Sequence, residues 1–367
     1  MAIAQAAVLT APRKLELREF ALPEIKFDDG LLRIEANGLC GTDYYQYLCK
    51  FEIGTGKLPI IPGHEPIGFI EKIGPQAAKR WKVADGDRVV VKAPLPCGRC
   101  RQCRMGATQR CERRMGYGLY VSTDIPPSLW GGYATHLYLH PDAEMEKAPA
   151  NISSDVLTLF NPLSGVVHWL LEIPKLRRDE HVVILGPGQR GILGVVAARH
   201  IGAKTVTISG LPQDTHRLAL AKELGADAIV DVSKEDIVER VREVTGGEKA
   251  DVVLDMSAGS TEPVLQAVDL ARTGGRIVLA GLKNGKPVNG LMTDKIVANE
   301  LQVLGGFAST AGSLQTALEI LKAHQHKLGR LCSHSFALDQ ADLAVRTLGR
   351  EIDDGKEVVH VTLVIAQ

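Results

Sequence analysis

The sequence predicts an α/β protein of two domains, an irregular antiparallel β-barrel and a doubly wound parallel sheet. Three observations lead to this prediction. The chain has 367 residues, and a single hydrophobic core rarely grows beyond about 250–300 residues. Short β-like segments fill the chain up to about residue 150, and strands alternate with helical patterns from about residue 180 onward.

The first part of the chain has the pattern of a barrel. Its segments are rich in β-branched and apolar residues and are separated by turn residues. They read "KLELREF", "GLLRIEANG", "IGFIEKIG", "DRVVVKA" and "YATHLYL". Short segments in this arrangement predict antiparallel strands in an irregular barrel.

The second part repeats an apolar strand followed by a helix. "HVVILG" leads into "GILGVVAARHIG", "KTVTIS" leads into "THRLALAKELG", and "DAIVDV", "ADVVLDM" and "GGRIVLAG" continue the series. Such alternation predicts a parallel, doubly wound sheet. Beyond about residue 305 come two helical patterns and a last strand, "VVHVTLVI", which we expect to return to the barrel. The predicted domains are therefore residues 1–160 with 305–367, and residues 161–304.

Composition and the N-terminal pattern limit the binding partners and the cellular location that we expect. Lys+Arg and Asp+Glu both number 43, and no second basic stripe lies outside the cysteine-rich loop. Since nucleic-acid binding depends on a basic surface, nucleic acid is not expected as a partner. The N-terminus lacks a basic patch followed by a long apolar core, so we expect no signal peptide, no membrane span and a cytoplasmic location.

Four cysteines within "CGRCRQCRMGATQRC" predict a structural zinc site. Cys97, Cys100, Cys103 and Cys111 follow the spacing C-x2-C-x2-C-x7-C, which lets one loop bring four thiolates to a tetrahedral ion. In a reducing compartment a metal site is favoured over disulfides. Four thiolates leave no open position, so this zinc would be structural. The surrounding arginines would suit a nucleic-acid-binding ribbon or offset the negative charge of the site; the zero net charge favours the second interpretation.

A glycine-rich turn between a strand and a helix predicts a dinucleotide site. Gly186 permits the tight turn, Gly188 lets backbone approach the pyrophosphate, and Gly191 lets the helix pack on the strand. The phosphates would lie at the N-terminus of the helix. The six residues of this turn are Gly186, Pro187, Gly188, Gln189, Arg190 and Gly191.

The next strand lacks the acidic residue that would bind the adenosine ribose of NAD. Ser209 and Gly210 stand there instead. Asp214 either reaches back to the ribose or caps the following helix, and His216 and Arg217 either meet a 2′-phosphate or form a solvated helix face. The choice between NAD and NADP stays open, with tolerance of NADP expected. Gly210→Asp is expected to shift the preference towards NAD.

Two further stretches, "NGLCGTDYYQY" and "IPGHEPIGFIEKIG", complete a family pattern. Together with the cysteine loop and the glycine turn, they make the whole chain resemble the zinc-dependent medium-chain alcohol dehydrogenases, in the sorbitol and threonine dehydrogenase branch of the medium-chain dehydrogenase/reductase superfamily. The resemblance implies a GroES-like catalytic barrel, a Rossmann domain, NAD or NADP, one catalytic and one structural zinc per chain, and a homodimer or homotetramer.

The resemblance also implies a catalytic zinc site. Cys40 and His64 match the family's zinc ligands, and Glu65 matches a direct or exchanging ligand. Asp43 matches the carboxylate that orients the histidine. Asn161 stands where relatives have a glutamate, and since an amide oxygen is a weak ligand, it binds either the zinc or its water, or only caps the segment before a proline.

The expected reaction is the reversible oxidation of a primary or secondary alcohol. Thr42 matches the residue that takes the substrate proton, but Tyr45 replaces the histidine of the outer proton relay. The resemblance places the nicotinamide near Leu279, Ala280 and Gly281 and near Gly305 and Gly306.

The aromatic cluster at 44–51, together with Tyr117 and Trp130, suggests an apolar wall for a bulky or cyclic alcohol. The members named for this wall are Tyr44, Tyr45, Tyr47, Leu48, Tyr117 and Trp130. The alternatives to an alcohol dehydrogenase are a zinc-independent enone reductase of the same fold and a catalytically silent NAD(P)-binding protein.

Overall fold

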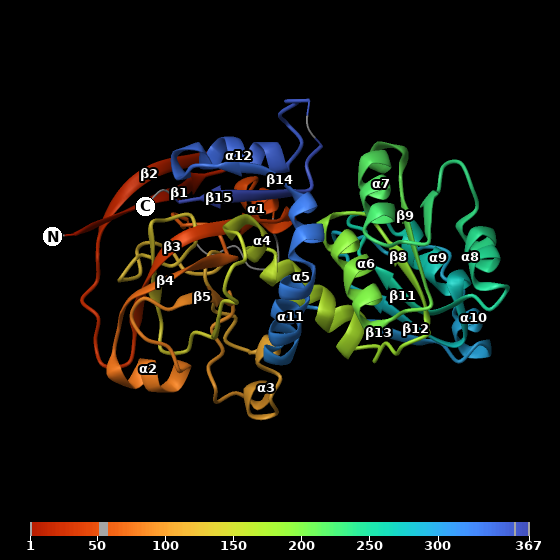
Figure 1. Ribbon diagram of the computed structural model, residues 1–367, viewed down its shortest axis with the longest axis horizontal. Helices are drawn as coiled ribbons and strands as arrows, with labels where there is room; N and C mark the ends of the chain where they lie inside the picture. The colour runs from red at the N-terminus through yellow and green to blue at the C-terminus, as the bar shows by residue number, and fades with distance from the viewer. Residues whose placement is uncertain (1, 51–57, 356, 366–367) are drawn as a thin grey trace. The chain divides into compact units, whose positions relative to one another are not determined.

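The computed structural model of the protein describes residues 2–50, 58–355 and 357–365. The chain divides into two compact units, Met1–Asn161 with Leu321–Gln367, and Pro162–Ile320 (Figure 1). The sequence predicts the second boundary at 304/305, whereas the structure has it at 320/321. It lies further on because α11 (Ala311–Leu328) begins in the second unit and continues into the first, with a break in helical geometry at His324.

The first unit is mainly β-structure. Its elements are β1 (Ile3–Ala11), β2 (Lys14–Ala21), β3 (Gly30–Leu39), α1 (Gly41–Tyr47), β4 (Pro66–Ile73), α2 (Pro75–Trp81), β5 (Arg88–Val91), α3 (Arg101–Arg104), η1 (Thr108–Arg110), β6 (His136–Leu139), β7 (Met145–Lys147), α4 (Ser154–Leu157), η4 (Gly329–Leu331), β14 (Cys332–Phe336), η5 (Leu338–Gln340), α12 (Ala341–Leu348) and β15 (His360–Val364). α5 (Phe160–Val166) begins at the end of this unit and continues into the other.

The strands of the first unit form one large sheet and one hairpin. The sheet has the order β14-β15-β3-β4-β5-β7, with β6 also paired to β3, and the hairpin pairs β1 with β2. All pairs are antiparallel except β14 with β15, which run parallel. Backbone hydrogen bonds from Ala7 to Tyr133 and from Leu9 to Ile60 tie β1 to the remainder of the unit. The predicted barrel strands are confirmed, with a parallel pair at one edge.

The second unit alternates strands and helices. Its elements are η2 (Val167–Glu172), β8 (His181–Leu185), α6 (Gln189–Ile201), β9 (Thr205–Gly210), η3 (Pro212–Asp214), α7 (Thr215–Glu223), β10 (Ala228–Asp231), α8 (Ile237–Thr245), β11 (Ala250–Asp255), α9 (Glu262–Leu270), β12 (Ala271–Leu279), α10 (Thr293–Ala298), β13 (Gln302–Gly305) and the first part of α11.

Six parallel strands form the sheet of this unit in the order β10-β9-β8-β11-β12-β13. Numbered from β8, this is the order 3-2-1-4-5-6 of a dinucleotide-binding doubly wound sheet, in which ligands bind at the carboxyl ends where the order reverses. Every residue of the two strands beside that point, β8 and β11, is buried, as expected of a sheet covered on both faces. The doubly wound prediction is confirmed.

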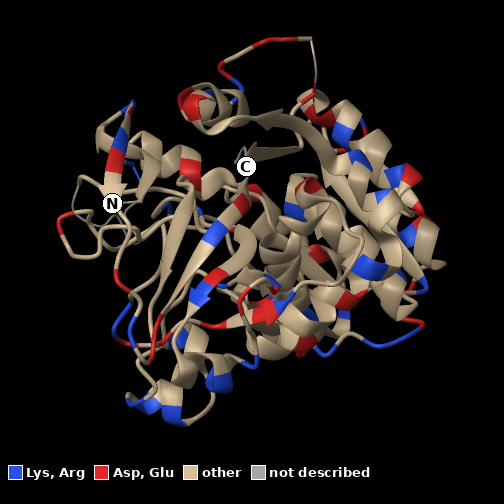
Figure 2. Cartoon of the chain, turned by 60° about the vertical axis from the view of Figure 1, so that its left-hand side comes forward, with Lys and Arg blue, Asp and Glu red and all other residues tan. Residues whose placement is uncertain are grey.

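Charged residues of both signs are interspersed along the ribbon of the described residues (Figure 2). Among the described residues, no helix combines the length and the apolar character needed to cross a membrane.

Candidate active site and metal centres

The register of β3 against β4 brings the first ligand group together. Asn37 pairs with Pro66 at the end of this ladder. Cys40 therefore leaves β3 next to the point where His64 and Glu65 lead into β4. Antiparallel pairing thus joins two motifs that lie 24 residues apart in the sequence.

Cys40, His64 and Glu65 form a compact buried donor set. The Sγ atom of Cys40 lies 3.2 Å from Nε2 of His64, and Nε2 lies 3.8 Å from Oε1 of Glu65. One donor atom from each residue lies within 4.8 Å of the others. All three residues are at most 5% exposed. A thiolate, an imidazole and a carboxylate are the ligands that zinc accepts in catalytic sites, so these residues fit the ion.

Asp43 contacts two members of this donor set. Its Oδ2 accepts the N–H of Cys40 at 2.9 Å, and its Oδ1 lies 3.5 Å from Nδ1 of His64. Burial lowers the pKa of His64, but the negative charges of Asp43 and Cys40 outweigh burial and raise this pKa well above its usual value. An environment that favours a positive charge on the imidazole also favours a bound divalent cation.

Asn161 contacts Glu65 directly. Its Nδ2 donates to Oε1 of Glu65 at 2.9 Å, so the amide holds the carboxylate that belongs to the donor set. This contact gives Asn161 a place in the predicted site whether or not its own oxygen is a ligand.

Thr42 and Tyr45 lie on α1, next to this donor set. Thr42 is half-buried and Tyr45 is 36% exposed, and residues three apart share one face of a helix. The position of Thr42 is therefore compatible with its predicted role in proton transfer, and the exposed Tyr45 lies on the same face of the helix.

The predicted apolar wall is wrong for most of its members. Tyr117, Trp130 and Tyr47 are buried in the core of the first unit. The hydroxyls of Tyr47 and Tyr44 donate to Asp342 and Glu351, at 2.6 and 2.8 Å. These tyrosines therefore anchor α1. Leu48 also packs against that core, and Phe51, at the end of the cluster, lies outside the described residues.

The four-cysteine loop forms the second donor set. The Sγ atoms of Cys97, Cys100, Cys103 and Cys111 lie within 4.8 Å of one another. Backbone N–H groups donate to three of them: Cys97 to Cys111 at 3.3 Å, Cys100 to Cys97 at 3.4 Å and Cys103 to Cys100 at 3.5 Å. All seven cysteines of the chain are free thiols.

Local hydrogen bonds favour thiolate in this loop. The N–H groups of Arg99 and Cys100 lower the pKa of the Cys97 thiol to about 6. Those of Glu112 and Cys103 lower the pKa of Cys100, whereas burial raises that of Cys103 to about 12. Because metals bind thiolates, this arrangement fits the structural zinc that the spacing predicts.

The glycine turn has the geometry that a dinucleotide requires. Gly186 has φ of +103°, a backbone conformation that favours glycine. A Cβ on Gly191 would lie 2.0 Å from the carbonyl oxygen of Gly186, so only glycine lets α6 start this close to β8. A Cβ on Gly188 would meet nothing within 4 Å, which leaves space for a phosphate at the start of the 13-residue helix α6.

Arg190 supplies a positive charge in this turn. Its guanidinium lies 5.1 Å from the ring centroid of Trp169, and its buried Nε has no hydrogen-bond partner among the described residues. Pro187, in the same turn, packs close to Gly210.

The strands at the other side of the sheet bring the predicted nicotinamide residues together. Leu279 pairs with Gly305 between β12 and β13, and the N–H of Gly306 donates to the carbonyl of Leu279 at 2.9 Å. Ala280 and Gly281 follow directly and both donate to the carbonyl of Asp255.

The structure at the end of β9 corrects the expected effect of Gly210→Asp. Gly210 is buried, and a Cβ there would lie 2.6 Å from the ring of Pro187. Gly210→Asp would therefore distort the phosphate turn rather than only add a carboxylate. Asp214, near Ser209 and Gly210, is bound locally: its Oδ2 accepts the N–H of Leu211 at 3.2 Å.

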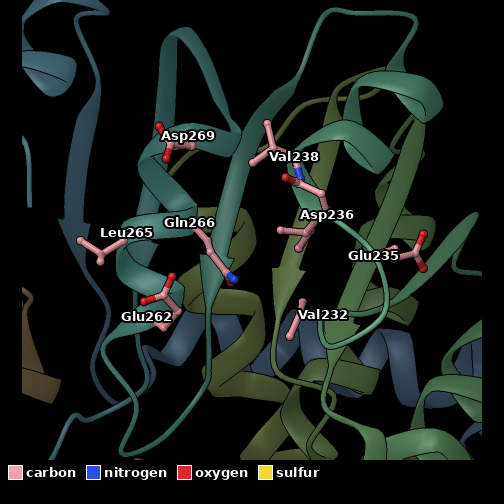
Figure 3. Close-up of a pocket in the computed structure, with 9 residues that line it drawn as sticks. Val232, Glu235, Asp236, Val238, Glu262, Leu265, Gln266 and Asp269 are labelled. Atoms are coloured by element: carbon pink, nitrogen blue, oxygen red, sulfur yellow. The ribbon is translucent and has the colours of Figure 1, made fainter. Parts of the chain in front are cut away.

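A groove of about 290 Å³ lies between α8 and α9 (Figure 3). It contains none of the predicted cofactor residues. Three of its four carboxylates have local roles: Asp236 caps α8, Asp269 pairs with Lys295 and Glu235 pairs with Arg240. An acidic groove would repel the phosphates of a dinucleotide, so we do not assign a ligand to it.

Tyr133 is a site residue that the sequence did not indicate. It is fully buried, and a Cβ on Gly63, which precedes His64, would lie 2.5 Å from its ring. Burial, followed by the charges of Asp43, Cys40 and Glu65, raises the pKa of its hydroxyl well above the usual value. A tyrosine in an apolar strand-like segment, "YATHLYL", carries no signal that distinguishes it from ordinary core.

Comparisons with known proteins agree with this geometry. The family model "Alcohol dehydrogenase GroES-like domain" matches residues 27–150, and "Zinc-binding dehydrogenase" matches residues 191–323. The "Probable alcohol dehydrogenase adh" of Mycobacterium tuberculosis is 40% identical over 366 residues, 99% of this chain and 98% of that protein. An L-threonine 3-dehydrogenase of Enterobacter sp. is 33% identical, over 75% of this chain and 76% of its own.

A solved structure extends the comparison to a cofactor. A zinc-binding dehydrogenase fold from Sinorhizobium meliloti, solved with bound NADP, matches with a TM-score of 0.85 and 26% identity over 99% of this chain and 100% of that chain.

The chain belongs to the zinc-type medium-chain alcohol dehydrogenases, as the resemblance of its motifs predicts. It is an oxidoreductase that acts on CH–OH donors. Its cofactors are zinc and a nicotinamide dinucleotide.

Proposed function

We propose that this enzyme reversibly oxidises a primary or secondary alcohol in a zinc-dependent reaction. The convergence of Cys40, His64 and Glu65, with Asp43 behind His64, carries the proposal. A zinc-independent enone reductase would have no use for this buried set of ligands. A catalytically silent NAD(P)-binding protein is the alternative that the departures at Tyr45 and Asn161 leave, and a turnover assay separates it.

The residues of the first unit have separate roles in zinc binding and proton transfer. Cys40, His64 and Glu65 hold the zinc, and Asn161 fixes Glu65 through its amide. When bound, zinc polarises the alcohol oxygen as a Lewis acid and the nicotinamide ring accepts a hydride. Thr42 accepts the proton of the substrate hydroxyl, and the exposed Tyr45 on the same face of α1 passes it to solvent.

The residues of the second unit hold the dinucleotide. Gly186–Gly191 receive the pyrophosphate at the start of α6, with Arg190 as an added positive charge. Leu279–Gly281 and Gly305–Gly306 receive the nicotinamide end. We also propose that the protein forms a homodimer or homotetramer and lies in the cytoplasm. A measurement of the native mass in solution tests the oligomeric state.

An alcohol screen tests the proposed reaction. We expect reduction of NAD or NADP with at least one primary or secondary alcohol, and loss of this activity when a chelator removes the more exchangeable zinc. The assay follows the absorbance of the reduced nicotinamide, and added zinc is the control that should restore the rate. Cofactor binding without turnover of any alcohol would support the silent binding protein instead.

Arg217 is expected to favour NADP. Because β9 ends in Gly210, no carboxylate at that position repels a 2′-phosphate, and Arg217 on α7 supplies a positive charge nearby in the sequence. One charge-assisted hydrogen bond contributes about a factor of ten in affinity. Arg217→Gln should therefore weaken NADPH binding about tenfold and leave NADH binding unchanged.

Lys222→Gln is the matched control for this prediction. It removes the same charge from the last turn of α7, where Lys222 donates to the carbonyl of Asp227. Fluorescence titration with both nucleotides measures the four dissociation constants. Equal losses for NADH and NADPH in Arg217→Gln would show that this arginine does not read the 2′-phosphate.

A further inference from the structure

A buried ion pair lies at the carboxyl edge of the parallel sheet. Asp255 is the last residue of β11 and is fully buried. Nζ of Lys283, in the loop after β12, lies 2.7 Å from its Oδ2, and the lysine side chain is only 12% exposed. Burying two charges costs desolvation free energy unless good geometry and further hydrogen bonds offset that cost. This ion pair therefore needs a structural explanation.

Ser257 and Asp255 engage the ammonium of Lys283. Ser257 accepts two of its three N–H donors, and the carboxylate of Asp255 pairs with its charge. The carbonyl oxygen and Oγ of Ser257 accept at 2.6 and 2.9 Å. Lys283 therefore acts inside the protein, as a clamp on Ser257 and Asp255.

Asp255 also binds Ser257. Its Oδ1 accepts the N–H of Ser257 at 3.0 Å and the hydroxyl at 2.6 Å. The carbonyl of Asp255 also accepts the N–H groups of Ala280 and Gly281, both at 2.9 Å. The loops after β11 and β12 are thus fastened to one carboxylate and one ammonium.

Ser257 lies between the two ends of the proposed dinucleotide site. A Cβ on Gly186, in the phosphate turn, would lie 3.1 Å from the nitrogen of Ser257, and a Cβ on Gly281 would lie 2.0 Å from its carbonyl oxygen. The backbone of Ser257 therefore sets the spacing between the phosphate turn and the nicotinamide loop.

We propose that Lys283 is a positioning residue for the dinucleotide. Through Asp255 and Ser257 it holds the Gly186 turn and the Gly281 loop at the spacing that a nicotinamide dinucleotide spans. The proposal rests on the proposed function in that it places the dinucleotide at this edge of the sheet. A preorganised site binds more tightly because ligand binding need not order the loops.

Lys283→Met tests the clamp because methionine keeps much of the side-chain length and removes the charge. We expect the Kd of both NADH and NADPH to rise about tenfold or more. The KM for the dinucleotide should rise with it, while the KM for the alcohol and the zinc content stay at the wild-type values. The change in nicotinamide fluorescence on binding reports Kd without any turnover.

Lys286→Met is the matched control. Lys286 lies in the same loop and is exposed, and its Nζ donates to the carbonyl of Gly259 at 2.9 Å. We expect wild-type Kd values for this variant.

A double variant covers the case in which Lys283→Met does not fold. Asp255→Asn with Lys283→Met leaves no unpaired buried charge, and its Kd should also exceed the wild-type value, since the bonds from Lys283 to Ser257 are still absent. Wild-type affinity in either folded variant overturns the clamp. Absence of NADH and NADPH binding by the wild-type protein would instead overturn the placement of the dinucleotide, which belongs to the proposed function.

Discussion

Cys40→Ala should lose one zinc per chain and nearly all turnover while it keeps its affinity for the dinucleotide. Cys40 supplies the only thiolate of the buried donor set with His64 and Glu65. Without it an imidazole and a carboxylate remain, and zinc retention should fail. Loss of the Lewis acid removes several kcal/mol of transition-state stabilisation, or about a thousandfold in rate. The proposed dinucleotide residues lie in the other compact unit, so the Kd for NADH should not change.

Asn161→Ala is the matched variant at the edge of the same site. Asn161 holds Glu65 through one hydrogen bond of 2.9 Å, and loss of such a supporting contact typically costs about 10–100-fold in metal affinity or activity. We expect this variant to keep zinc and to lose only part of its rate. Metal analysis, alcohol oxidation and NADH titration on both proteins decide the matter. Wild-type zinc and wild-type rate in Cys40→Ala would mean that the proposed zinc chemistry is wrong.

Local patterns in the sequence predict the fold well, because both halves have a strong periodicity. β8 and β11 read as continuous apolar runs, and both are central strands of the parallel sheet. The sequence does not predict β7, whose three residues are too few to show a pattern, or β13, in which only Val303 and Leu304 are apolar. The position of the second boundary depends on how α11 packs rather than on its own sequence.

The candidate site also has residues that local sequence patterns predict and residues that they do not. Cysteine spacing and the glycine turn are local signals, and the structure brings the residues of each together. Only the fold shows that Tyr133 lies beside the zinc donor set of the first unit. It likewise shows that Lys283 and Asp255 lie beside the dinucleotide turn of the second. Tyr44 and Tyr47 failed as substrate contacts because their hydroxyls bind Glu351 and Asp342, about 300 residues away, and no local pattern signals such partners.

Cys100→Ser should destabilise the whole first unit rather than only slow the reaction. Cys100 stands in the middle of the four-cysteine loop, where its Sγ accepts the N–H of Cys103 and its own N–H donates to Cys97. The regular structure in the loop is short, since α3 has four residues and η1 has three. Structural zinc contributes about 10–16 kcal/mol to the folding of small zinc-finger peptides, whereas whole domains are stable by about 5–15 kcal/mol. Loss of this ion is therefore comparable with the total stability.

The measurement combines zinc content, solubility and melting temperature. Cys49→Ser is the matched control, since Cys49 is an exposed thiol in the same unit, outside both donor sets; it should keep both zinc ions and the wild-type melting temperature. Cys100→Ser should precipitate, or melt well below the wild-type protein with one zinc fewer. If Cys100→Ser stays soluble and fully folded with unchanged zinc, the loop does not need its fourth thiolate to hold the metal. That result would overturn the prediction that the Cys100 thiolate is needed for the metal and for the stability of the first unit.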